Sequence, residues 1–333
     1  MTAPLLSVRH LDVRFDGTPP VQALSDIGFD LAAGEVLGLL GESGSGKSAL
    51  LRTLLRLHRA TGTRIAGEIV FDGVDVLTLE RRALQRYRGG SVSMVFQEPG
   101  LAFDPVYTVG DQIAESIRAH ERVDRATARQ RALRLLDRVQ IPQAARRLDA
   151  YPHELSGGMR QRAMIALALA CGPRLLLADE PTTALDATVQ IQILLLLREL
   201  QRESGMAMIF VTHDIGAAIE VADRIAVMYA GRIVEDRVDA LVSHPRHHYS
   251  AGLLASTVAA SDRGRPLPAI GGSPPDLSLV PRGCAFAPRC DGASTRCHHD
   301  RPPLASDDGG RLACWHPVAT AAVARAHSRA DAP

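Results

Sequence analysis

Eight residues near the start of the chain have the types and spacing of a phosphate-binding loop. The run from Gly41 to Ser48 fits the pattern G-x-x-x-x-G-K-[ST], and it follows a short apolar stretch, 35–40, that is typical of a buried strand. Leucines at helical spacing then predict a helix over 47–57. In this context the glycines let backbone N–H groups turn inward around phosphate oxygens, and the helix N-terminus adds a favourable dipole.

The lysine of this loop is the only lysine in the chain. Lysine and arginine together number 38, so arginine supplies the other 37 cations. A compact ammonium group fits inside a ring of loop amides, whereas a planar guanidinium is too wide. We therefore expect Lys47 to contact the β- and γ-phosphates of a nucleotide, and the hydroxyl of Ser48 to bind Mg²⁺. The alternative is an ordinary glycine- and serine-rich turn before a helix.

Two acids follow another apolar run, 175–178, which predicts a second buried strand. Asp179 at its end could hold Mg²⁺, directly or through water. Glu180 beside it could polarise an attacking water as a general base. The alternative is that these acids only cap the next helix.

The segment from Leu155 to Gln161 predicts a helix start that can bind an anion. Ser156 is a natural N-cap, and Gly157 and Gly158 expose the first amides of the helix that follows. Taken alone, this segment could equally be an ordinary helix start.

Four of the five cysteines gather near the C-terminus, with the spacing C-x5-C-x6-C-x16-C from Cys284 through Cys290 and Cys297 to Cys314. In a cytosolic protein, clustered cysteines indicate a metal more than disulfides. Structural zinc usually shows C-x2–4-C pairs, which are absent, so the wider spacing favours a [4Fe–4S] cluster. Zinc, free thiols and disulfides are the alternatives. We expect Cys171, on an apolar helix, to lie in the core.

Strand-like and helical segments alternate along most of the chain. The first hundred residues read as short strands with one helix, and the stretch 108–170 reads as a helical insertion. This alternation predicts an α/β fold with a mostly parallel sheet covered on both faces. We expect an ATPase domain over 1–260, a Pro-rich linker and Cys-rich extension over 261–318, and a disordered tail over 319–333.

The composition is that of a soluble globular protein. The chain has 333 residues, of which 46% are apolar and 23% charged, and its formal net charge of +1 argues against a nucleic-acid surface. No apolar run reaches the ~18 residues that a membrane span needs, and the N-terminus lacks the apolar core of a signal peptide. We expect a cytosolic protein whose membrane role, if it has one, comes through partners.

Taken together, the motifs resemble those of an ATP-binding cassette subunit, over about residues 5–255. The family's motifs stand in order at Gly41–Ser48, Gln97, Leu155–Gln161, Asp179-Glu180, Ala184–Asp186 and His213. The resemblance implies a P-loop ABC ATPase cassette with a helical subdomain, followed here by a small irregular C-terminal Cys-rich extension.

The resemblance also implies roles for individual residues. Glu180, His213 and Gln97 would be catalytic: the base, a γ-phosphate contact, and a γ-phosphate sensor that also contacts Mg²⁺ or the water. Ser48, Gln97 and Asp179 would bind Mg²⁺. The residues implied to contact nucleotide are Phe15 (by stacking on adenine), Gly41, Ser43, Gly44, Ser45, Gly46, Lys47, Ser48, Ala49, Gln97, Ser156, Gly157, Gly158, Asp179, Asp186 and His213.

Partners follow from the same resemblance. Two cassettes would pair head to tail with ATP between them, so that Ser156 and Gly158 contact the ATP of the opposite subunit and Asp186 lies at the subunit interface. We expect two different cassettes, with a pair of identical ones as the alternative. Two membrane permeases and, indirectly, a solute-binding protein would complete a transporter. The chain would then lie at the cytoplasmic face of the inner membrane, without nucleic acid.

Several stretches, such as Gly110–Ile113, Tyr151–Leu155 and Arg282–Cys290, are similar to ATPases of dipeptide and oligopeptide importers, some of which bind a [4Fe–4S] cluster. Peptide import is therefore the expected function. The alternatives are import of nickel or another solute, and a soluble cassette that acts on DNA or ribosomes without transport. A metal-binding redox module with a vestigial cassette is a third alternative, against which Glu180 and His213 argue.

Overall fold

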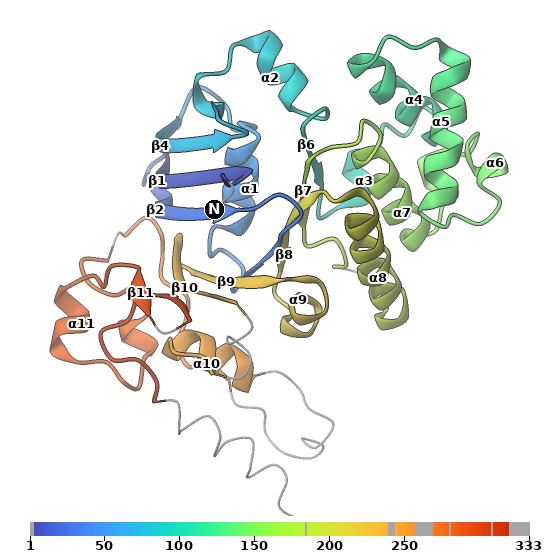
Figure 1. Ribbon diagram of the computed structural model, residues 1–333. Helices are drawn as coiled ribbons and strands as arrows, with labels where there is room; N and C mark the ends of the chain where they lie inside the picture. Colours follow the sequence, from blue (N-terminus) through green and yellow to red (C-terminus); the bar gives the residue numbers. More distant parts are fainter. Residues whose placement is uncertain are drawn as a thin grey trace, which may run out of the picture. The chain divides into compact units, whose positions relative to one another are not determined.

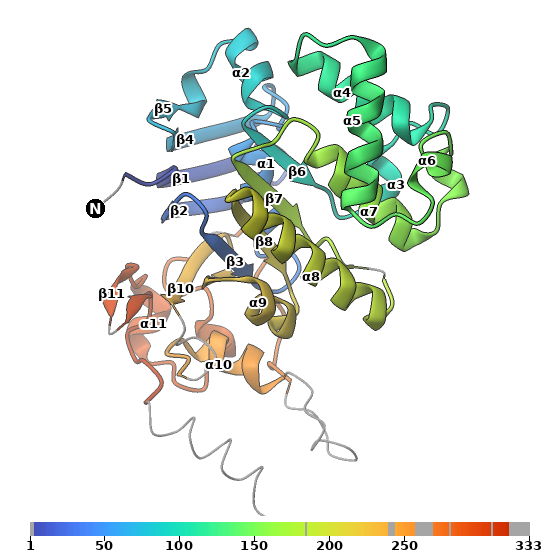
Figure 2. The ribbon, with the colours of Figure 1, turned by 45° about the vertical axis from the view of Figure 1, so that its right-hand side comes forward.

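The computed structural model describes residues 3–183, 185–238, 244–256, 269–279, 281–307 and 309–319. Its elements are labelled in Figures 1 and 2. The chain forms two compact units, which are described separately. The first unit comprises Met1–Leu6, Asp30–Val36 and Val70–Thr212, and the second comprises Ser7–Phe29, Leu37–Ile69 and His213–Pro333.

The first unit contains a parallel sheet and most of the helices of the described residues. Its elements, in chain order, are β5 (Val74–Asp75), η1 (Val76–Thr78), α2 (Arg81–Tyr87), β6 (Val92–Val95), α3 (Pro99–Ala102), α4 (Val109–His120), α5 (Arg125–Arg138), α6 (Ala144–Arg147), η2 (Pro152–Glu154), α7 (Gly157–Ala168), β7 (Leu175–Asp179), α8 (Ala187–Ser204) and β8 (Ala207–Thr212).

Three strands of this unit, β6, β7 and β8, are buried along their whole length and belong to a larger sheet. Strand β7 pairs in parallel with β6 on one side and with β8 on the other. Every residue of the three strands is buried. Continuous apolar runs of this kind suit parallel strands that are covered on both faces. The carboxyl ends of β6, β7 and β8 therefore lie at one edge of the sheet.

The longer helices of the first unit begin at side chains that accept hydrogen bonds from their first backbone N–H groups. These N-caps are Thr108 for α4, Asp124 for α5, Ser156 for α7 and Asp186 for α8. Each cap satisfies a donor that the helix itself cannot pair. Figure 1 shows α4 to α7 gathered in one helical region.

The second unit contains the N-terminal strands, the strands that follow His213 and the short C-terminal elements. Its elements, apart from end residues that fall in the first unit, are β1 (Leu6–Phe15), β2 (Val21–Leu31), β3 (Val36–Leu40), α1 (Lys47–Leu54), β4 (Thr63–Phe71), α9 (Ile215–Val221), β9 (Arg224–Tyr229), β10 (Arg232–Val238), α10 (His248–Ala255), η4 (Ala287–Arg289), α11 (Thr295–His299), β11 (Ala305–Asp307) and β12 (Gly310–Leu312).

Two sheets run through the second unit. Strands β2, β1 and β4 are neighbours in one of them, and in the other the order is β11-β12-β10-β9-β3. Strand β3 pairs in parallel with β9, whereas β10 pairs antiparallel with both β9 and β12. Strand β3 is entirely buried and leads into the loop 41–46. The end of β3 therefore sets where that loop starts.

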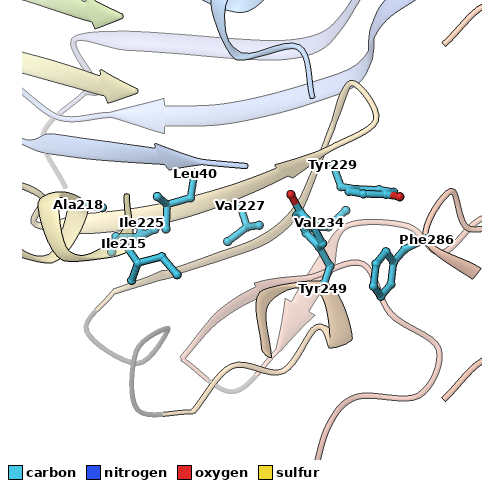
Figure 3. Close-up of a cluster of buried hydrophobic side chains, with 9 residues drawn as sticks. All are labelled: Leu40, Ile215, Ala218, Ile225, Val227, Tyr229, Val234, Tyr249 and Phe286. Atoms are coloured by element: carbon cyan, nitrogen blue, oxygen red, sulfur yellow. The ribbon is translucent and has the colours of Figure 1, made fainter. Parts of the chain in front are cut away.

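An apolar cluster holds the C-terminal elements of this unit against β3 and β9. Figure 3 shows Tyr229, Tyr249 and Phe286 meeting at one end of the cluster. The ring centroids of Tyr229 and Tyr249 are 4.5 Å apart, and Phe286 lies 5.2 Å from Tyr229 and 5.4 Å from Tyr249. Aromatic contacts at these distances add to the stabilisation from burial. Phe286 comes from the segment 281–319, which we call the cysteine segment.

Charged pairs also join the cysteine segment to β10. Asp236 is buried and accepts hydrogen bonds from Arg224 and Arg311, and Arg237 pairs with Asp307. Because buried charges are costly unless they are paired, these contacts favour one arrangement of β12 on β10.

The predicted strands and helices are largely confirmed, with two corrections. The first hundred residues contain α2 and η1 as well as the expected helix α1. Cys171 is half-buried instead of lying in the core, because α7 ends at Ala168 and Cys171 falls in the turn beyond it. The proposed domain boundaries stay predictions, because residues 257–268, around the predicted start of the linker at 261, and residues 320–333 of the predicted tail lie outside the described residues.

No helix among the described residues is both long enough and apolar enough to cross a membrane.

Candidate functional site

The loop 41–48 has a backbone that only glycine can follow at two of its positions. Gly41 has φ of 156°, and a Cβ there would lie 2.3 Å from the carbonyl oxygen of Met228. Gly46, the N-cap of α1, has φ of 102°, and a Cβ there would lie 2.7 Å from the carbonyl oxygen of Ala23. Helix α1 has no side-chain cap. The loop thus packs tightly on its neighbours while directing a helix N-terminus toward the space where an anion can bind.

Lys47 is buried, and its ammonium group lies along the loop itself. Its Nζ donates hydrogen bonds to the carbonyl oxygens of Gly41, at 2.7 Å, and Glu42, at 2.9 Å. Only 5% of Lys47 is exposed. Charged phosphate oxygens would be stronger acceptors than these neutral carbonyl oxygens for the same ammonium protons.

The other predicted loop residues surround this lysine. Ser45 is buried, and its carbonyl oxygen accepts a hydrogen bond from the N–H of Gly231, at 2.9 Å. Ser43 and Gly44 are exposed, and Ser48 and Ala49 are half-buried. Phe15, predicted to stack on adenine, lies at the end of β1, where its ring meets the edge of His58 with centroids 5.1 Å apart.

Glu42 is a member of the loop whose contacts the sequence did not reveal. Its N–H donates to the phenol oxygen of Tyr249, at 2.8 Å. Its carboxylate accepts two hydrogen bonds from Arg289, at 2.7 and 3.0 Å. An acid inside an anion-binding loop needs a cation nearby, and this requirement was the available signal.

The first unit brings together two of the predicted catalytic residues. Gln97 follows β6 and donates a hydrogen bond from Nε2 to Oε2 of Glu180, at 3.3 Å. Asp179, the last residue of β7, is only 2% exposed. The carboxyl end of β7 therefore carries a buried acid, followed by a partly exposed acid in contact with an amide.

Glu180 has a strained backbone. Its φ is 45°, in the left-handed region that a residue with a Cβ rarely adopts. Its N–H donates to the carbonyl oxygen of Val211, and its carboxylate accepts a hydrogen bond from Thr183 at 3.0 Å. Strain of this kind tends to persist where a side chain must be aimed, so it supports a functional role for this residue.

Ser156 begins helix α7 as the sequence predicted. Its Oγ accepts a hydrogen bond from the N–H of Met159, at 3.3 Å, and Ser156 and Gly157 are exposed. A Cβ at Gly158 would lie 2.9 Å from Cγ1 of Val189, so the starts of α7 and α8 approach closely. Asp186 caps α8 from an exposed position.

His213 is the first residue after β8, and it is exposed. It belongs to the second unit, as does the loop 41–48, whereas Gln97, Asp179 and Glu180 belong to the first. Asp214 beside it caps helix α9 by accepting from the N–H of Ala217. Within each unit, then, the predicted residues end strands or begin helices, which are the places where backbone and side-chain polar groups converge on a ligand.

The four C-terminal cysteines line one small pocket in the second unit, together with His247, Phe286 and Trp315. Burial raises the pKa of Cys314 to about 11 and also raises the pKa values of Cys284 and Cys290. As free thiols, Cys284, Cys290 and Cys314 would be protonated at neutral pH. Within the part of the chain that the structure describes, no group of three or more His, Cys, Asp or Glu side chains could hold a metal ion.

Two family models match the chain. The model described as ABC transporter matches residues 24–183, and the model described as Oligopeptide/dipeptide transporter, C-terminal region, matches residues 235–297.

Relatives match over nearly the whole chain. A protein of Brucella melitensis biotype 1, provisionally named a peptide import ATP-binding protein, is 48% identical over 95% of this chain and 98% of its own length. One of Brucella abortus (strain 2308), with the same kind of name, is 49% identical over 93% of this chain and 94% of its own length.

Solved structures share the fold. A dimeric structure of the ATP-binding cassette MJ0796 in a post-hydrolysis state, bound to ADP and Pi, has a TM-score of 0.63 at 29% identity, covering 70% of this chain and 98% of that one. The cbiO1 protein of Clostridium perfringens, part of the ABC transporter complex cbiONQ, has a TM-score of 0.60 at 28% identity, covering 71% of this chain and 88% of that one.

The phosphate loop, the acids that end β7 and the shared fold define an ABC ATPase, an enzyme that binds and hydrolyses ATP. The chain belongs to the ABC transporter family and, within it, to the ATP-binding proteins of peptide importers.

Proposed function

We propose that this chain hydrolyses ATP at the loop 41–48 and thereby energises an importer of dipeptides or oligopeptides. The observation that carries the proposal is the hydrogen bond between Gln97 and Glu180. A general base beside an amide is suited to orient a water for attack on a γ-phosphate. A protein that bound nucleotide without hydrolysing it would not need Gln97 and Glu180 side by side.

In the proposed binding step, the ammonium group of Lys47 moves from loop carbonyl oxygens to the β- and γ-phosphates, and the loop amides hold the phosphates in place. Ser48, Gln97 and Asp179 offer hydroxyl, amide and carboxylate oxygens, which are the hard ligands that Mg²⁺ prefers. When bound, Mg²⁺ neutralises charge on the phosphates.

In the proposed hydrolytic step, Glu180 accepts a proton from the attacking water while Gln97 fixes the position of that water. His213 donates a hydrogen bond to the γ-phosphate. The charge that develops on the phosphoryl oxygens is stabilised by Lys47 and the loop amides, which are already oriented before the reaction.

A second cassette would complete each nucleotide site. Ser156, Gly157 and Gly158 would present the start of α7 to an ATP held by that partner, and Asp186 would lie at the contact. The dimeric relative with ADP and Pi supports a paired arrangement. We expect the partner to be a different cassette, as is usual in this class of importer.

Two permease subunits would carry the solute across the membrane, supplied by a solute-binding protein, with this chain at the cytoplasmic face. Exposed apolar side chains of the first unit support a docking surface for permeases. Phe96 is 39% exposed, Val106 68% and Tyr107 57%, and all three lie close in sequence to Gln97. A permease seated on these residues would connect its motion to the γ-phosphate sensor.

We also propose that Cys284, Cys290, Cys297 and Cys314 hold a [4Fe–4S] cluster. The support is their wide spacing and the pocket that all four line, although their side chains as they stand do not form a metal-binding group. The cluster would add one-electron chemistry to the cysteine segment. Anaerobically purified protein should be brown and lose visible absorption with dithionite, and a colourless protein with stoichiometric zinc would contradict the assignment.

Reconstitution tests the transport function. The chain, its partner cassette and their two permeases would be placed in vesicles with the solute-binding protein, and uptake of a labelled dipeptide measured against uptake of Ni²⁺. ATP-dependent peptide uptake is expected. Uptake of Ni²⁺ alone would point to a metal importer, and hydrolysis without uptake of either solute would point to a cassette that is not coupled to peptide transport.

A further inference from the structure

Glu42 connects the phosphate loop to the far end of the chain. Its three polar groups all have partners within the second unit: its N–H donates to Tyr249, its carbonyl oxygen accepts from Lys47, and its carboxylate accepts from Arg289. Tyr249 and Arg289 lie 207 and 247 residues further along the chain. The backbone of the loop at this position is therefore held by elements that follow the nucleotide-binding core in sequence.

Arg289 is buried and has hydrogen-bond partners besides Glu42. Its side chain is 4% exposed, and its two terminal nitrogens reach the two carboxylate oxygens of Glu42 at 2.7 and 3.0 Å. Its Nε donates to the carbonyl oxygen of Gly271 at 2.8 Å, and a terminal nitrogen also reaches the phenol oxygen of Tyr229 at 3.2 Å. A bidentate, buried and multiply bonded guanidinium is the strong form of this interaction.

The guanidinium group of Arg289 lies against aromatic rings. Its guanidinium carbon lies 5.8 Å from the ring centroid of Tyr229 and 5.9 Å from that of Phe286, within the range of cation–π attraction. Figure 3 shows these two rings packed with Tyr249, the same residue that accepts the hydrogen bond from Glu42. The hydrogen bond from Glu42 to Tyr249 and the ion pair of Glu42 with Arg289 are therefore both supported by the cluster of Tyr229, Tyr249 and Phe286.

The charge of Glu42 explains why the loop needs this partner. A carboxylate within a loop that receives a triphosphate would repel it, and repulsion between charges is strong where water is partly excluded. Arg289 neutralises that charge. Its two hydrogen bonds also hold the carboxylate in one position, so that the carboxylate does not move freely within the loop. Without Arg289, the charge of Glu42 would repel the phosphates and the loop would be less restrained. Both effects would weaken ATP binding.

We propose that Arg289 is a positioning residue for ATP binding, which makes the cysteine segment a working part of the nucleotide site. Arg289 is the last residue of η4 and directly precedes Cys290, so the conformation of the cysteine segment sets where the guanidinium lies. The proposal rests on the proposed role of loop 41–48 in binding ATP, and it does not depend on which group, if any, the cysteines hold.

The test is equilibrium binding of a fluorescent ATP analogue to the purified full-length chain, with thermal unfolding measured on the same samples. Arg289→Gln should raise the Kd for nucleotide about tenfold, within the usual range of coupling between distinct sites. Arg289→Lys keeps the charge without the planar fork, so it should raise the Kd less than Arg289→Gln does.

A double variant separates the charge effect from general damage. Because the unpaired carboxylate causes part of the loss, Glu42→Gln combined with Arg289→Gln should bind nucleotide more tightly than Arg289→Gln alone. The matched control is Arg296→Gln, which removes an arginine of the same segment that stacks on Trp315 and pairs with exposed Asp300. This control should leave the Kd unchanged.

Three results would overturn the proposal. The first is an unchanged Kd in Arg289→Gln, even if its melting temperature falls, because Arg289 would then be structural only. The second is a double variant that binds no better than the single one. The third, which applies if Arg289→Gln does not fold, is an unchanged Kd in Arg289→Lys. Lys47→Ala, measured in the same assay, separates failure of this proposal from failure of the proposed function. Unchanged nucleotide binding in Lys47→Ala would contradict the role of loop 41–48 in binding ATP.

Discussion

The phosphate loop and the carboxyl end of β7 are held in their positions in different ways. Asp179 and Glu180 end a buried strand that has a parallel neighbour on each side, and the contacts that hold them come from the sheet and from nearby residues such as Thr183. The loop 41–48 likewise follows a buried strand, β3, and is bonded locally by Lys47, but it differs in the contacts of its acid. Its acid is held by Tyr249 and Arg289 from the end of the chain.

This difference indicates how each region should respond to change. The end of β7 depends on a sheet that forms cooperatively with the core, so it should be affected chiefly by substitutions of its own side chains. The loop depends on side chains that arrive from the C-terminal part of the second unit. It should therefore respond to changes made far away in sequence.

The largest effect should come from the loop's own lysine. Lys47→Ala removes the charge that would hold the phosphates, so the hydrolysis rate should fall on the order of 10²–10³-fold. The measurement is steady-state ATPase activity, with absorption or metal content used to check that the cysteine segment is intact. Peptide uptake that survives this change in a complex whose partner cassette is also inactive would contradict the transport function.

Glu180→Gln should separate catalysis from binding at the end of β7. The amide keeps the size and hydrogen-bonding capacity of the side chain but cannot accept the proton, so kcat should fall about 10²–10³-fold while the Kd for ATP stays near the wild-type value. Single-turnover hydrolysis and nucleotide binding measure the two quantities.

The matched control for this change is Glu203→Gln, which alters an exposed acid of the same unit that pairs with Arg138. It should change neither quantity. Wild-type turnover in Glu180→Gln would remove Glu180 from the catalytic step.

Mild acid should act on the second unit through the histidine that begins α10. The longer helices of the first unit begin at Thr, Ser or Asp, whereas α10 begins at His247, whose Nδ1 accepts a hydrogen bond from the N–H of Tyr249. Burial, and secondarily the nearby His248, lower the pKa of His247 to about 3. The unfolded chain therefore binds a proton below about pH 6.5 that the folded chain does not, and stability falls with falling pH until about pH 3.

The expected loss from His247 is about 2 kcal/mol in the free energy of unfolding between pH 7 and pH 5. His247→Asn supplies a cap that does not titrate, so its unfolding free energy should fall less over this range than that of the wild type. Chemical denaturation at the two pH values measures it, with His299→Asn, at an exposed histidine of the same unit, as the control. Equal pH dependence in wild type and His247→Asn would show that His247 does not carry this effect.

The smallest effect should come from a single oxygen atom. Tyr249→Phe removes the phenol that accepts the N–H of Glu42 and leaves that donor in a half-buried place, at a cost of about 1 kcal/mol. Nucleotide binding should weaken several-fold. Tyr107→Phe, which changes an exposed tyrosine of the first unit, should have no effect. Equal affinities in the two variants would mean that Tyr249 does not support the loop.

Much of the fold could be predicted because its signals are local. The apolar runs before Gly41 and Asp179 are long enough to specify buried strands, and Ser156 and Asp186 cap helices as their types suggest. Helix α2 was missed because it is short and its exposed residues give little periodicity. Cys171 was misplaced because the stop signals, Gly172 and Pro173, come after it, whereas α7 already ends at Ala168.

The part of the site that could not be predicted depends on contacts between distant residues. The pattern of Gly41–Ser48 indicates that Glu42 needs a cation but does not show which one, and nothing in the spacing of the cysteines shows that Arg289 points toward that loop. Such pairs follow from how β9, β10 and α10 fold together, which a reading of local spacing does not reach. The functional roles of the individual site residues stay predictions until variants are measured.

The single lysine has a practical consequence for studying this protein. Since Lys47 is the only side chain with a primary amine and is 5% exposed, amine-selective reagents have one side-chain target, and it lies where the phosphates would bind. The rate of its acylation would therefore report on occupancy of this one loop, without background from other lysines. The same scarcity means that attachment through surface lysines, by immobilisation or by amine cross-linking, would act on the nucleotide site before any other side chain.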